Sequence, residues 1–233
     1  MTTAVILQAR LDSTRLPGKS LLPLGGKPLV LRVMEALKGV WGDRYVLACP
    51  EDCVAAFGPL AEQAGFDLVA GSKEDVLSRY CVAVRRFTLD RLIRATGDNP
   101  FVFVDAANTL SQEALSRKAD YAGYSGLPYG AGVESVAAEA LLRAERDASL
   151  KAEREHVCPY LYTHPDLFQL HRPLAPLVWQ APSLRISLDT LEDYQRAQVL
   201  FEALAASGGE RFQGETIITA YRRSYTPLEG KQP

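Results

Sequence analysis

Short apolar runs alternate with helical patterns along the N-terminal part of the chain. The runs of strand length lack the strict alternation of a half-exposed strand and lie at 4–9, 44–49, 66–69 and 90–96. The helical patterns, each with apolar residues on one face, lie at 28–39, 51–65 and 72–87. This order predicts an α/β fold with a Rossmann-like, doubly wound and mostly parallel sheet.

Two local features refine these helices. We expect Ser72 to cap the helix over 72–87, because a serine hydroxyl accepts hydrogen bonds from the first free N–H groups of a helix. Gly58-Pro59 is expected to interrupt the helix over 51–65, because proline lacks an N–H group. In a doubly wound sheet ligands bind beyond the carboxyl ends of the strands. The loops at 8–27, 70–75 and 97–100 fall at that edge.

The second half of the chain has a mixed pattern. Strands are predicted at 119–125, 132–139, 167–173 and 184–189. Helices are predicted at 139–148, 153–163, 192–207 and 214–223, and residues 226–233 are expected to be frayed. No repeat or linker divides the chain. We therefore expect one domain over 1–233, with a small mixed α+β lobe inserted at about 121–182.

Composition narrows the classes of partner. The chain has 233 residues, 47% apolar and 23% charged, which is ordinary for a globular protein. The net charge of −2 provides no basic field for nucleic acid or a membrane surface. No apolar run has the length of a membrane span, and the N-terminus lacks the pattern of a signal peptide. We expect a cytoplasmic protein that binds small molecules, with no nucleic acid and no membrane partner.

The cysteines are predicted to be free thiols. None of Cys49, Cys53, Cys81 and Cys158 has the C-x-x-C spacing of a redox or metal motif. Cys49 ends an apolar run and is expected in the core. A metal cluster of His156, Cys158 and His164 is a minor alternative, because this spacing fits no zinc pattern.

The loop after the first strand resembles a phosphate-binding P-loop only at its end. Gly18-Lys19-Ser20 matches the last part of that motif, but Ser13 occupies the position of its first glycine. Pro23 and the glycines that follow it prevent the long helix that a P-loop requires. Since FVFVD at 101–105 also resembles a Walker B strand, a P-loop ATPase or kinase stays open as an alternative.

The same loop carries cations that suit a triphosphate. Arg10 follows the strand directly, and Lys19 lies further along the loop, beyond the Pro17-Gly18 bend. A folded loop brings both to one triphosphate, which guanidinium binds in bidentate fashion and ammonium as a point charge. The alternative is an ordinary solvated basic loop.

The motifs together resemble one enzyme family. They are QARLDSTRLPGKSLLPLGGKPL, GSKEDVLSRY, RATGDNPFV, GVE, REHVCPYLY and LRISLDTLEDY, in that order over about residues 4–200. This series is similar to the sugar-acid cytidylyltransferases, which act on ketodeoxyoctonate (KDO) or acylneuraminates, and is most similar to their spore coat polysaccharide (SpsF) branch. The resemblance implies a single nucleotidyltransferase domain of the nucleotide-diphospho-sugar transferase type.

The resemblance implies a magnesium-dependent reaction. Such enzymes transfer CMP from CTP to a sugar acid and release pyrophosphate, here for a surface or spore-coat polysaccharide. Asp98 and Asp189 match the family's aspartates that bind Mg²⁺, and the implied catalytic set is Arg10, Lys19, Asp98 and Asp189. As other interpretations, Asp98 is a turn residue and Asp189 a helix N-cap. A different NTP, a phosphorylated acceptor, or a catalytically silent nucleotide-sugar-binding module stay as alternatives.

Further residues are assigned through the same motifs. The implied nucleotide-binding residues are Gln8, Ala9, Arg10, Ser13, Arg15, Gly18, Lys19, Gly71 and Ser72. KDO enzymes carry an arginine just before the loop at 71–72, and this chain does not. The implied acceptor-binding residues are Tyr129, Glu134, Arg154, His156 and Tyr160, with Arg154 as a partner for a sugar carboxylate. His156 is otherwise a packed helix residue. Family members are often homodimers that complete the sugar site across subunits, so a homodimer is expected.

Overall fold

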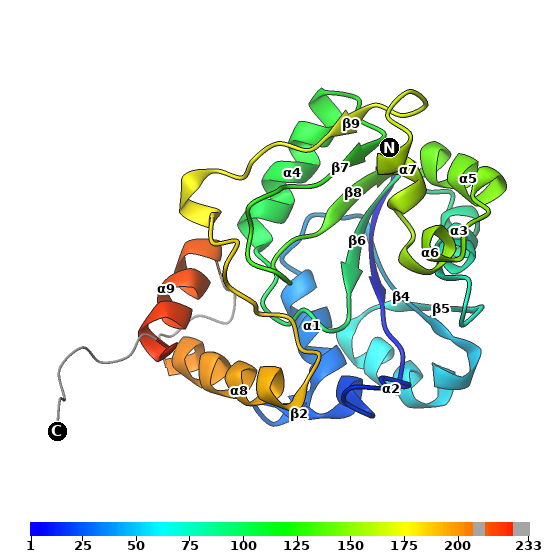
Figure 1. Ribbon diagram of the computed structural model, residues 1–233. Coiled ribbons are helices and arrows are strands. Elements are labelled where there is room, and N and C mark those ends of the chain that lie inside the picture. Colours follow the sequence, from blue (N-terminus) through cyan, green and yellow to red (C-terminus); the bar gives the residue numbers. More distant parts are fainter. Residues whose placement is uncertain (207–212, 226–233) are drawn as a thin grey trace, which may run out of the picture.

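The computed structural model describes residues 1–206 and 213–225 and has a twisted sheet at its centre (Figure 1). In this part of the chain the sheet has seven strands, in the order β5-β4-β1-β6-β8-β7-β9. Their bounds are β1 Thr3–Gln8, β4 Arg44–Pro50, β5 Asp67–Gly71, β6 Arg91–Thr96, β7 Tyr121–Ala122, β8 Glu134–Ala137 and β9 Leu170–His171. β5, β4, β1 and β6 are mutually parallel, while β8 runs antiparallel to β6 and β7. The predicted α/β fold with a mostly parallel sheet is confirmed.

β1 is an interior strand of this sheet, with β4 on one side and β6 on the other. Leu7 pairs with Leu47 of β4 on one side and with Ala95 of β6 on the other. The side chains from Ala4 to Leu7 are all fully buried, although they point alternately to opposite faces. Both faces must therefore be covered, which explains why all residues of the strand between Thr3 and Gln8 are apolar.

Helices cover the two faces in two groups. Their bounds are α1 Leu29–Leu37, α2 Val54–Ala64, α3 Val76–Phe87, α4 Val104–Ser116, α5 Ala138–Asp147, α6 Lys151–His156, α7 Pro159–Thr163, α8 Leu191–Ala206 and α9 Gly214–Tyr225. One apolar core contains residues of α1, α2, α4, α8 and α9, and a second contains residues of α3, α5 and α7. Strands β7, β8 and β9 of the predicted inserted lobe extend the main sheet (Figure 1).

Short elements shape the loop between β1 and α1. A 3₁₀ turn, η1 (Lys19–Leu21), is followed by β2 (Pro23–Leu24) and β3 (Lys27–Pro28), which pair as a hairpin. The hairpin turns at Gly25 and Gly26, which have φ of 56° and 79°, values that suit glycine. The Tyr194 hydroxyl of α8 donates to the Pro23 carbonyl over 2.6 Å and ties this loop to the C-terminal helices.

Two predicted helix features are wrong. Helix α3 begins at Val76, and the Asp75 carboxylate, not the Ser72 hydroxyl, caps it by accepting from the Ser78 N–H over 2.9 Å. Ser72 instead accepts from the Asp75 N–H within the preceding turn. Helix α2 continues through Pro59, because Phe57 and Ala61 pack into the core on either side of it. The remaining short 3₁₀ turns are η2 (Glu51–Cys53) and η3 (Leu177–Trp179).

Other elements differ in extent. The structure contains α4, which was not predicted, since buried Asn108 and Ser111 blur its apolar face. The segment at 184–189 is not a strand but an extended chain with one bridge from Arg185 to Tyr129. Ile186 and Leu188 are buried without a ladder, because loop carbonyls accept their N–H groups. Val157, with φ of 74°, divides the predicted helix at 153–163 into α6 and α7.

The cysteines agree with the prediction, since all four are free and buried. No helix within residues 1–206 and 213–225 combines the length and the apolar character needed to cross a bilayer. Residue 207 of a predicted helix and the predicted frayed segment at 226–233 lie outside the described residues.

Candidate active site

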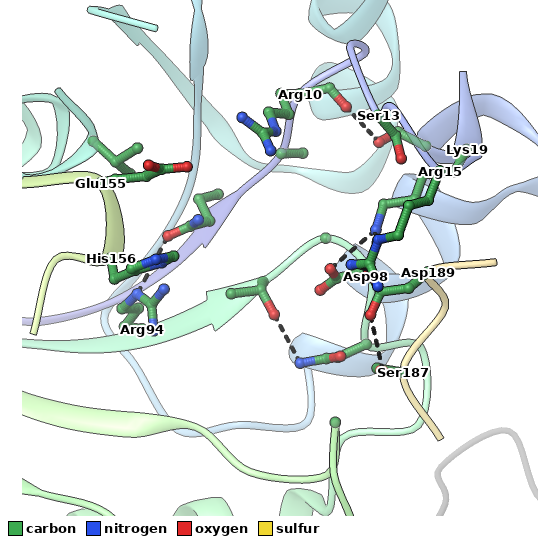
Figure 2. A pocket seen from close by; sticks show the side chains of 18 of the residues that line it. Arg10, Ser13, Arg15, Lys19, Arg94, Asp98, Glu155, His156, Ser187 and Asp189 are labelled. Carbon is green, nitrogen blue, oxygen red and sulfur yellow. Dashed lines mark hydrogen bonds and ion pairs between the residues drawn. The ribbon is translucent and has the colours of Figure 1, made fainter. Parts of the chain in front are cut away.

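A cavity of about 450 Å³ opens at the carboxyl ends of β1 and β6 (Figure 2). Its charged lining is mainly cationic. Six side chains are basic, namely Arg10, Arg15, Lys19, Lys73, Arg79 and Arg94, and three are acidic, namely Asp98, Glu155 and Asp189. This balance suits a highly anionic ligand such as a triphosphate.

The loop after β1 forms one wall of the cavity. Gly18, with φ of 66°, precedes η1 and turns the chain so that Lys19 enters the cavity. The Ser20 hydroxyl donates to the Arg10 carbonyl over 2.8 Å, and the Ser13 hydroxyl accepts from the Leu16 N–H over 3.3 Å. These bonds fold the loop back on itself, so Arg10, Ser13 and Lys19 face the same space.

The P-loop alternative is wrong. Lys19 begins a three-residue 3₁₀ turn, whereas a P-loop lysine begins a long helix with its N-terminus at the phosphates. Asp105 of the Walker B-like segment lies in the first turn of α4. Its carboxylate accepts from the Trp179 indole N–H over 2.9 Å and from the Gly214 N–H over 3.1 Å. Asp105 therefore has a structural role.

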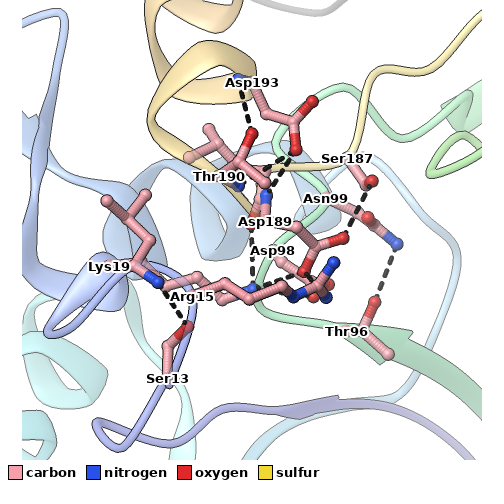
Figure 3. Close-up of polar contacts among 12 residues, drawn as sticks. Ser13, Arg15, Lys19, Thr96, Asp98, Asn99, Ser187, Asp189, Thr190 and Asp193 are labelled. Carbon is pink, nitrogen blue, oxygen red and sulfur yellow. Dashed lines mark hydrogen bonds and ion pairs between the residues drawn. The ribbon is translucent and has the colours of Figure 1, made fainter.

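Lys19 lies between the two aspartates that the motifs single out (Figure 3). Its ammonium donates to Asp98 Oδ2 over 3.1 Å, to Asp189 Oδ1 over 3.0 Å and to the Leu188 carbonyl over 2.8 Å. Three oxygen atoms thus converge on one cationic point. Carboxylate and carbonyl oxygens are the ligands that hard divalent cations prefer.

Asp98 owes its position to a close contact between two loops. Gly97 donates its N–H to the Gln8 carbonyl over 2.8 Å. A Cβ atom at position 97 would lie 2.9 Å from the Ala9 Cβ, so a side chain does not fit there. The turn continues through Asn99, whose amide donates to the Thr96 hydroxyl over 2.7 Å. Asp98 is therefore both a turn residue and a cavity residue.

Asp189 is held in a cluster of cations. It is bound by Lys19, by Arg15 over 2.9 Å and by Arg185. Burial alone would raise the pKa of Asp189, but the hydrogen bond and charge of Lys19 and the charges of Arg15 and Arg185 hold the pKa below its ordinary value. The carboxylate is therefore ionised over the whole neutral range.

The helix-cap interpretation of Asp189 is wrong, because the next residues form the cap of α8. The Thr190 hydroxyl accepts from the Asp193 N–H over 3.2 Å, and the Asp193 carboxylate accepts from the Thr190 N–H over 3.0 Å. This reciprocal pair is a capping box. Asp193 also accepts from the Asp189 N–H over 3.1 Å, so the cap fixes the backbone of Asp189 while its side chain faces Lys19 (Figure 3).

The opposite wall comes from the second half of the chain. His156 and Glu155, at the end of α6, lie across the cavity from Asp98 and Asp189 (Figure 2). Tyr129 is 61% exposed, and the Arg185 guanidinium lies 4.5 Å from the centroid of its ring. A polar and aromatic wall of this kind suits a hydroxylated ligand beside the triphosphate.

Several predicted residues do not line this cavity. Gly18 and Ser72 shape its loops, and Gly71 ends β5 against the side chain of Arg79. Arg154 binds Asp75 through two N–H groups at 2.7 and 2.6 Å, and so supports the start of α3. Tyr160 stacks on His164 with ring centroids 4.2 Å apart.

Glu134 lies in a second cavity of about 300 Å³ beside the first. It accepts from the Tyr121 hydroxyl over 2.7 Å and pairs with Arg94, which also donates to the Gln8 side chain over 3.2 Å. Burial alone would lower the pKa of Arg94, but the Glu134 carboxylate raises the pKa above its ordinary value. Glu134 thus fixes a cation at the boundary of the two cavities.

Sequence reasoning missed Lys73, Arg79 and Arg94. Arg94 interrupts the apolar pattern of β6, and Arg79 interrupts the apolar face of α3. A charged residue within an otherwise apolar stretch was therefore the sequence feature that could have identified these two site residues. Lys73 lies in a loop that was expected at the ligand edge, and pairs with Asp12 over 2.8 Å.

In the described part of the chain no group of three or more histidine, cysteine, aspartate or glutamate residues forms a metal cluster. The alternative at His156, Cys158 and His164 is therefore wrong.

Comparison with known proteins decides the family. A family model described as cytidylyltransferase matches residues 4–211. The chain belongs to the cytidylyltransferase family. The predicted resemblance is thereby confirmed, and the protein is a nucleotidyltransferase.

Relatives agree with this membership. The cytidylyltransferase is 34% identical over 231 residues to the spore coat polysaccharide biosynthesis protein SpsF of Bacillus subtilis, with 94% of this chain and 93% of that protein covered. A cytidylyltransferase structure from Leptospira borgpetersenii has a TM-score of 0.88 at 22% identity, covering 100% and 99% of the two chains. The structure of CMP:2-keto-3-deoxy-manno-octonic acid synthetase complexed with CTP has a TM-score of 0.67 at 17% identity, covering 90% and 100%. At these identities the two structures establish the fold.

Proposed function

We propose that this cytidylyltransferase transfers CMP from CTP to a sugar acid with the help of Mg²⁺ and releases pyrophosphate. The observation that carries the proposal is the convergence of Asp98, Asp189 and the Leu188 carbonyl on the Lys19 ammonium. One cation holds two carboxylates at the edge of the sheet where nucleotides bind in doubly wound folds.

The oxygen atoms around Lys19 fit a divalent cation. Mg²⁺ is commonly bound by one or two carboxylates, with water and substrate phosphates as its other ligands. Asp98 and Asp189 would supply the protein ligands and the nucleotide the rest. When bound there, the metal would offset the negative charge of the α-phosphate.

In this proposal the basic side chains stabilise the departing pyrophosphate. The acceptor hydroxyl loses its proton to water and its oxygen forms a bond to the α-phosphorus, while the bond from that phosphorus to the oxygen that bridges the α- and β-phosphates breaks. Negative charge accumulates on the departing pyrophosphate. Lys19, once released from the aspartates, and Arg10 and Arg15 lie on the loop that would face that group. Cations fixed beforehand stabilise such charge without reorganisation.

The acceptor lies in this proposal on the wall formed by Tyr129 and His156, with the second cavity at Arg94 as its continuation. A sugar acid fits this wall because it presents hydroxyl groups to the polar side chains and a carboxylate to the cations. The SpsF relative is named a spore coat polysaccharide biosynthesis protein, which supports the use of the product in polysaccharide synthesis. A homodimer that completes this site stays a prediction.

Pyrophosphate release tests the proposal. The purified protein is incubated with Mg²⁺, one of CTP, UTP, GTP or ATP, and a panel of sugar acids. We expect release with CTP and at least one sugar acid. Asp98→Asn should abolish release while leaving the melting temperature within a few degrees, and Asp166→Asn, an exposed carboxylate away from the cavity, serves as control. Release that is unchanged in Asp98→Asn, or that occurs only with ATP, would contradict the proposal.

A further inference from the structure

Arg79 is a buried cation that lines the active-site cavity. It lies in the first turns of α3, is 3% exposed, and borders the cavity together with Val76. Its NH1 group donates to the Ser72 carbonyl over 2.7 Å, whereas its Nε–H is buried and has no hydrogen-bond partner. Among the described residues no carboxylate forms an ion pair with it.

The other cavity arginines differ from Arg79 in this respect. Arg15 pairs with Asp189, Arg94 with Glu134 and Arg10 with Asp12. Burial lowers the pKa of Arg79 from its ordinary value, as expected for a cation that has lost water without gaining an anion. A buried charge without a partner is costly, so its retention at a cavity wall points to a ligand that supplies acceptors.

The position of Arg79 in the sheet selects the part of the nucleotide. Arg79 lies against the end of β5, since a Cβ atom on Gly71 would approach the Arg79 Cγ to 3.1 Å. Asp98 follows β6, and the order β5-β4-β1-β6 separates these strands by three spacings, or about 14 Å. With the α-phosphate near Asp98 and the acceptor on the wall of Tyr129 and His156, as proposed above, the nucleoside would extend across β1 toward β5. Arg79 thus lies at the base and not at the phosphates.

The neighbours of Arg79 also suit a base. Val76 and Ala9 line the same cavity and are almost fully buried, which provides an apolar surface for a flat ring. A strongly hydrated phosphate gains nothing from such a surface, whereas a heterocycle stacks on it. A guanidinium has N–H donors and no acceptor. It therefore matches a ring edge that presents two adjacent acceptors.

We propose that Arg79 binds the base of CTP, donating N–H groups to O2 and N3 of cytosine, and so selects cytidine over uridine. Uracil carries a proton on N3, which would face the guanidinium as a second donor. The proposal rests on the proposed function, because it takes CTP as the substrate. Base selection is thereby assigned to a residue of helix α3. Residues 71 and 72 of this chain are glycine and serine, which carry no guanidinium group.

Equilibrium binding tests this role without turnover. Calorimetry compares CTP, UTP and inorganic tripolyphosphate on the wild type, Arg79→Met, Arg79→Lys and the control Arg86→Met, an exposed arginine of the same helix. We expect the wild type to prefer CTP, and Arg79→Met to weaken CTP binding roughly 10- to 100-fold, the range of a bidentate base contact. UTP and tripolyphosphate binding should change little, so that the CTP to UTP ratio approaches one. Arg79→Lys should keep part of the preference.

Each other outcome overturns the proposal. Equal weakening of CTP, UTP and tripolyphosphate in Arg79→Met would make Arg79 a phosphate ligand. Unchanged CTP binding, with a lowered melting temperature, would make it a structural residue. Equal affinity of the wild type for CTP and UTP would show that the protein does not select the base. Pyrophosphate release is measured in a separate experiment, so the binding result can still be interpreted when the proposed transfer reaction is not observed.

Discussion

The Lys19 ammonium lies 3.0 Å from the Asp189 carboxylate, at the end of a loop that looks like a P-loop in sequence. Asp98 and the Leu188 carbonyl share the same ammonium. Lys19 thus occupies the point where a metal ion bound by the two aspartates would lie. In the proposed function, Lys19 would compete with the metal before substrate binds and would be a free cation for the phosphates afterwards.

Removal of Lys19 should therefore have opposite effects on metal binding and catalysis. We expect Lys19→Ala to bind Mg²⁺ or Mn²⁺ at least about tenfold more tightly without nucleotide, because no ammonium neutralises Asp98 and Asp189. Transfer should fall roughly hundredfold, the loss typical of one charge-stabilising group. Electron paramagnetic resonance of free Mn²⁺ measures the first effect and pyrophosphate release the second. Lys151→Ala, an exposed residue of α6, is the control. Unchanged metal affinity together with unchanged pyrophosphate release in Lys19→Ala would contradict both roles and leave the loop as an ordinary solvated basic loop.

Arg185 positions Asp189 without lining the cavity. It pairs with Asp189, lies 3.5 Å from Asp193 and stacks on Tyr129. We expect Arg185→Met to weaken metal binding about tenfold, as loss of an outer hydrogen-bond partner does at metal sites. Activity should recover at high Mg²⁺, and Arg185→Lys should restore part of the affinity. A loss of activity that excess Mg²⁺ does not reverse would contradict this role.

The capping box of α8 predicts a stability effect. Thr190→Ala removes the hydroxyl that accepts from the Asp193 N–H and should cost about 1 kcal/mol. For a chain of this length that loss lowers the melting temperature by about 2–4 °C. Thr109→Ala, which removes a hydroxyl bond inside α4, should cost less than about 0.5 kcal/mol. Equal losses in the two variants would show that the cap is not formed.

The buried thiols predict a defined pH response. Burial raises the pKa of Cys49 from its ordinary 9.0 to about 11 and also raises that of Cys53. The folded state therefore favours the protonated thiols. Their contribution to the free energy of unfolding is complete below about pH 9 and is lost as the pH rises toward 11.

Thiol titration and unfolding curves measure this response. No cysteine should react with a thiol reagent at pH 8 in the native protein, and all four should react after denaturation. Cys49→Ala should reduce the fall in stability between pH 9 and 11. A native thiol that reacts within seconds would contradict the burial of these residues.

Much of the fold follows from local pattern. The strands β1 and β4 and the helices α1 and α3 are long and strongly apolar on the buried side, so periodicity alone locates them. Helix α4 was missed because tertiary contacts satisfy its polar residues. Asn108 accepts from the Trp41 N–H over 2.8 Å and donates to the Gly39 carbonyl over 3.1 Å, and sequence cannot show such partners.

Some residues of the candidate site could likewise be predicted from the sequence, and others could not. Arg10 and Lys19 were predicted from the basic loop after the first strand, Asp98 and Asp189 were predicted from the family resemblance, and the structure brings all four to one cavity. Arg154 was expected to face a ligand, but its guanidinium binds Asp75 of the loop before α3, a partner far away in sequence. Residue type indicates what a side chain is able to bind, whereas the fold decides which partner reaches it.

The most direct test of the central claim is the effect of Mg²⁺ on CTP binding in the wild type, Asp98→Asn and Asp189→Asn. Calorimetric titrations are run in Mg²⁺ and in EDTA. Two aspartates that hold the metal predict that Mg²⁺ strengthens CTP binding about tenfold or more in the wild type. The same addition should bring no gain in either variant. An equal gain from Mg²⁺ in all three proteins would contradict the claim, because the metal would then be held by the nucleotide alone.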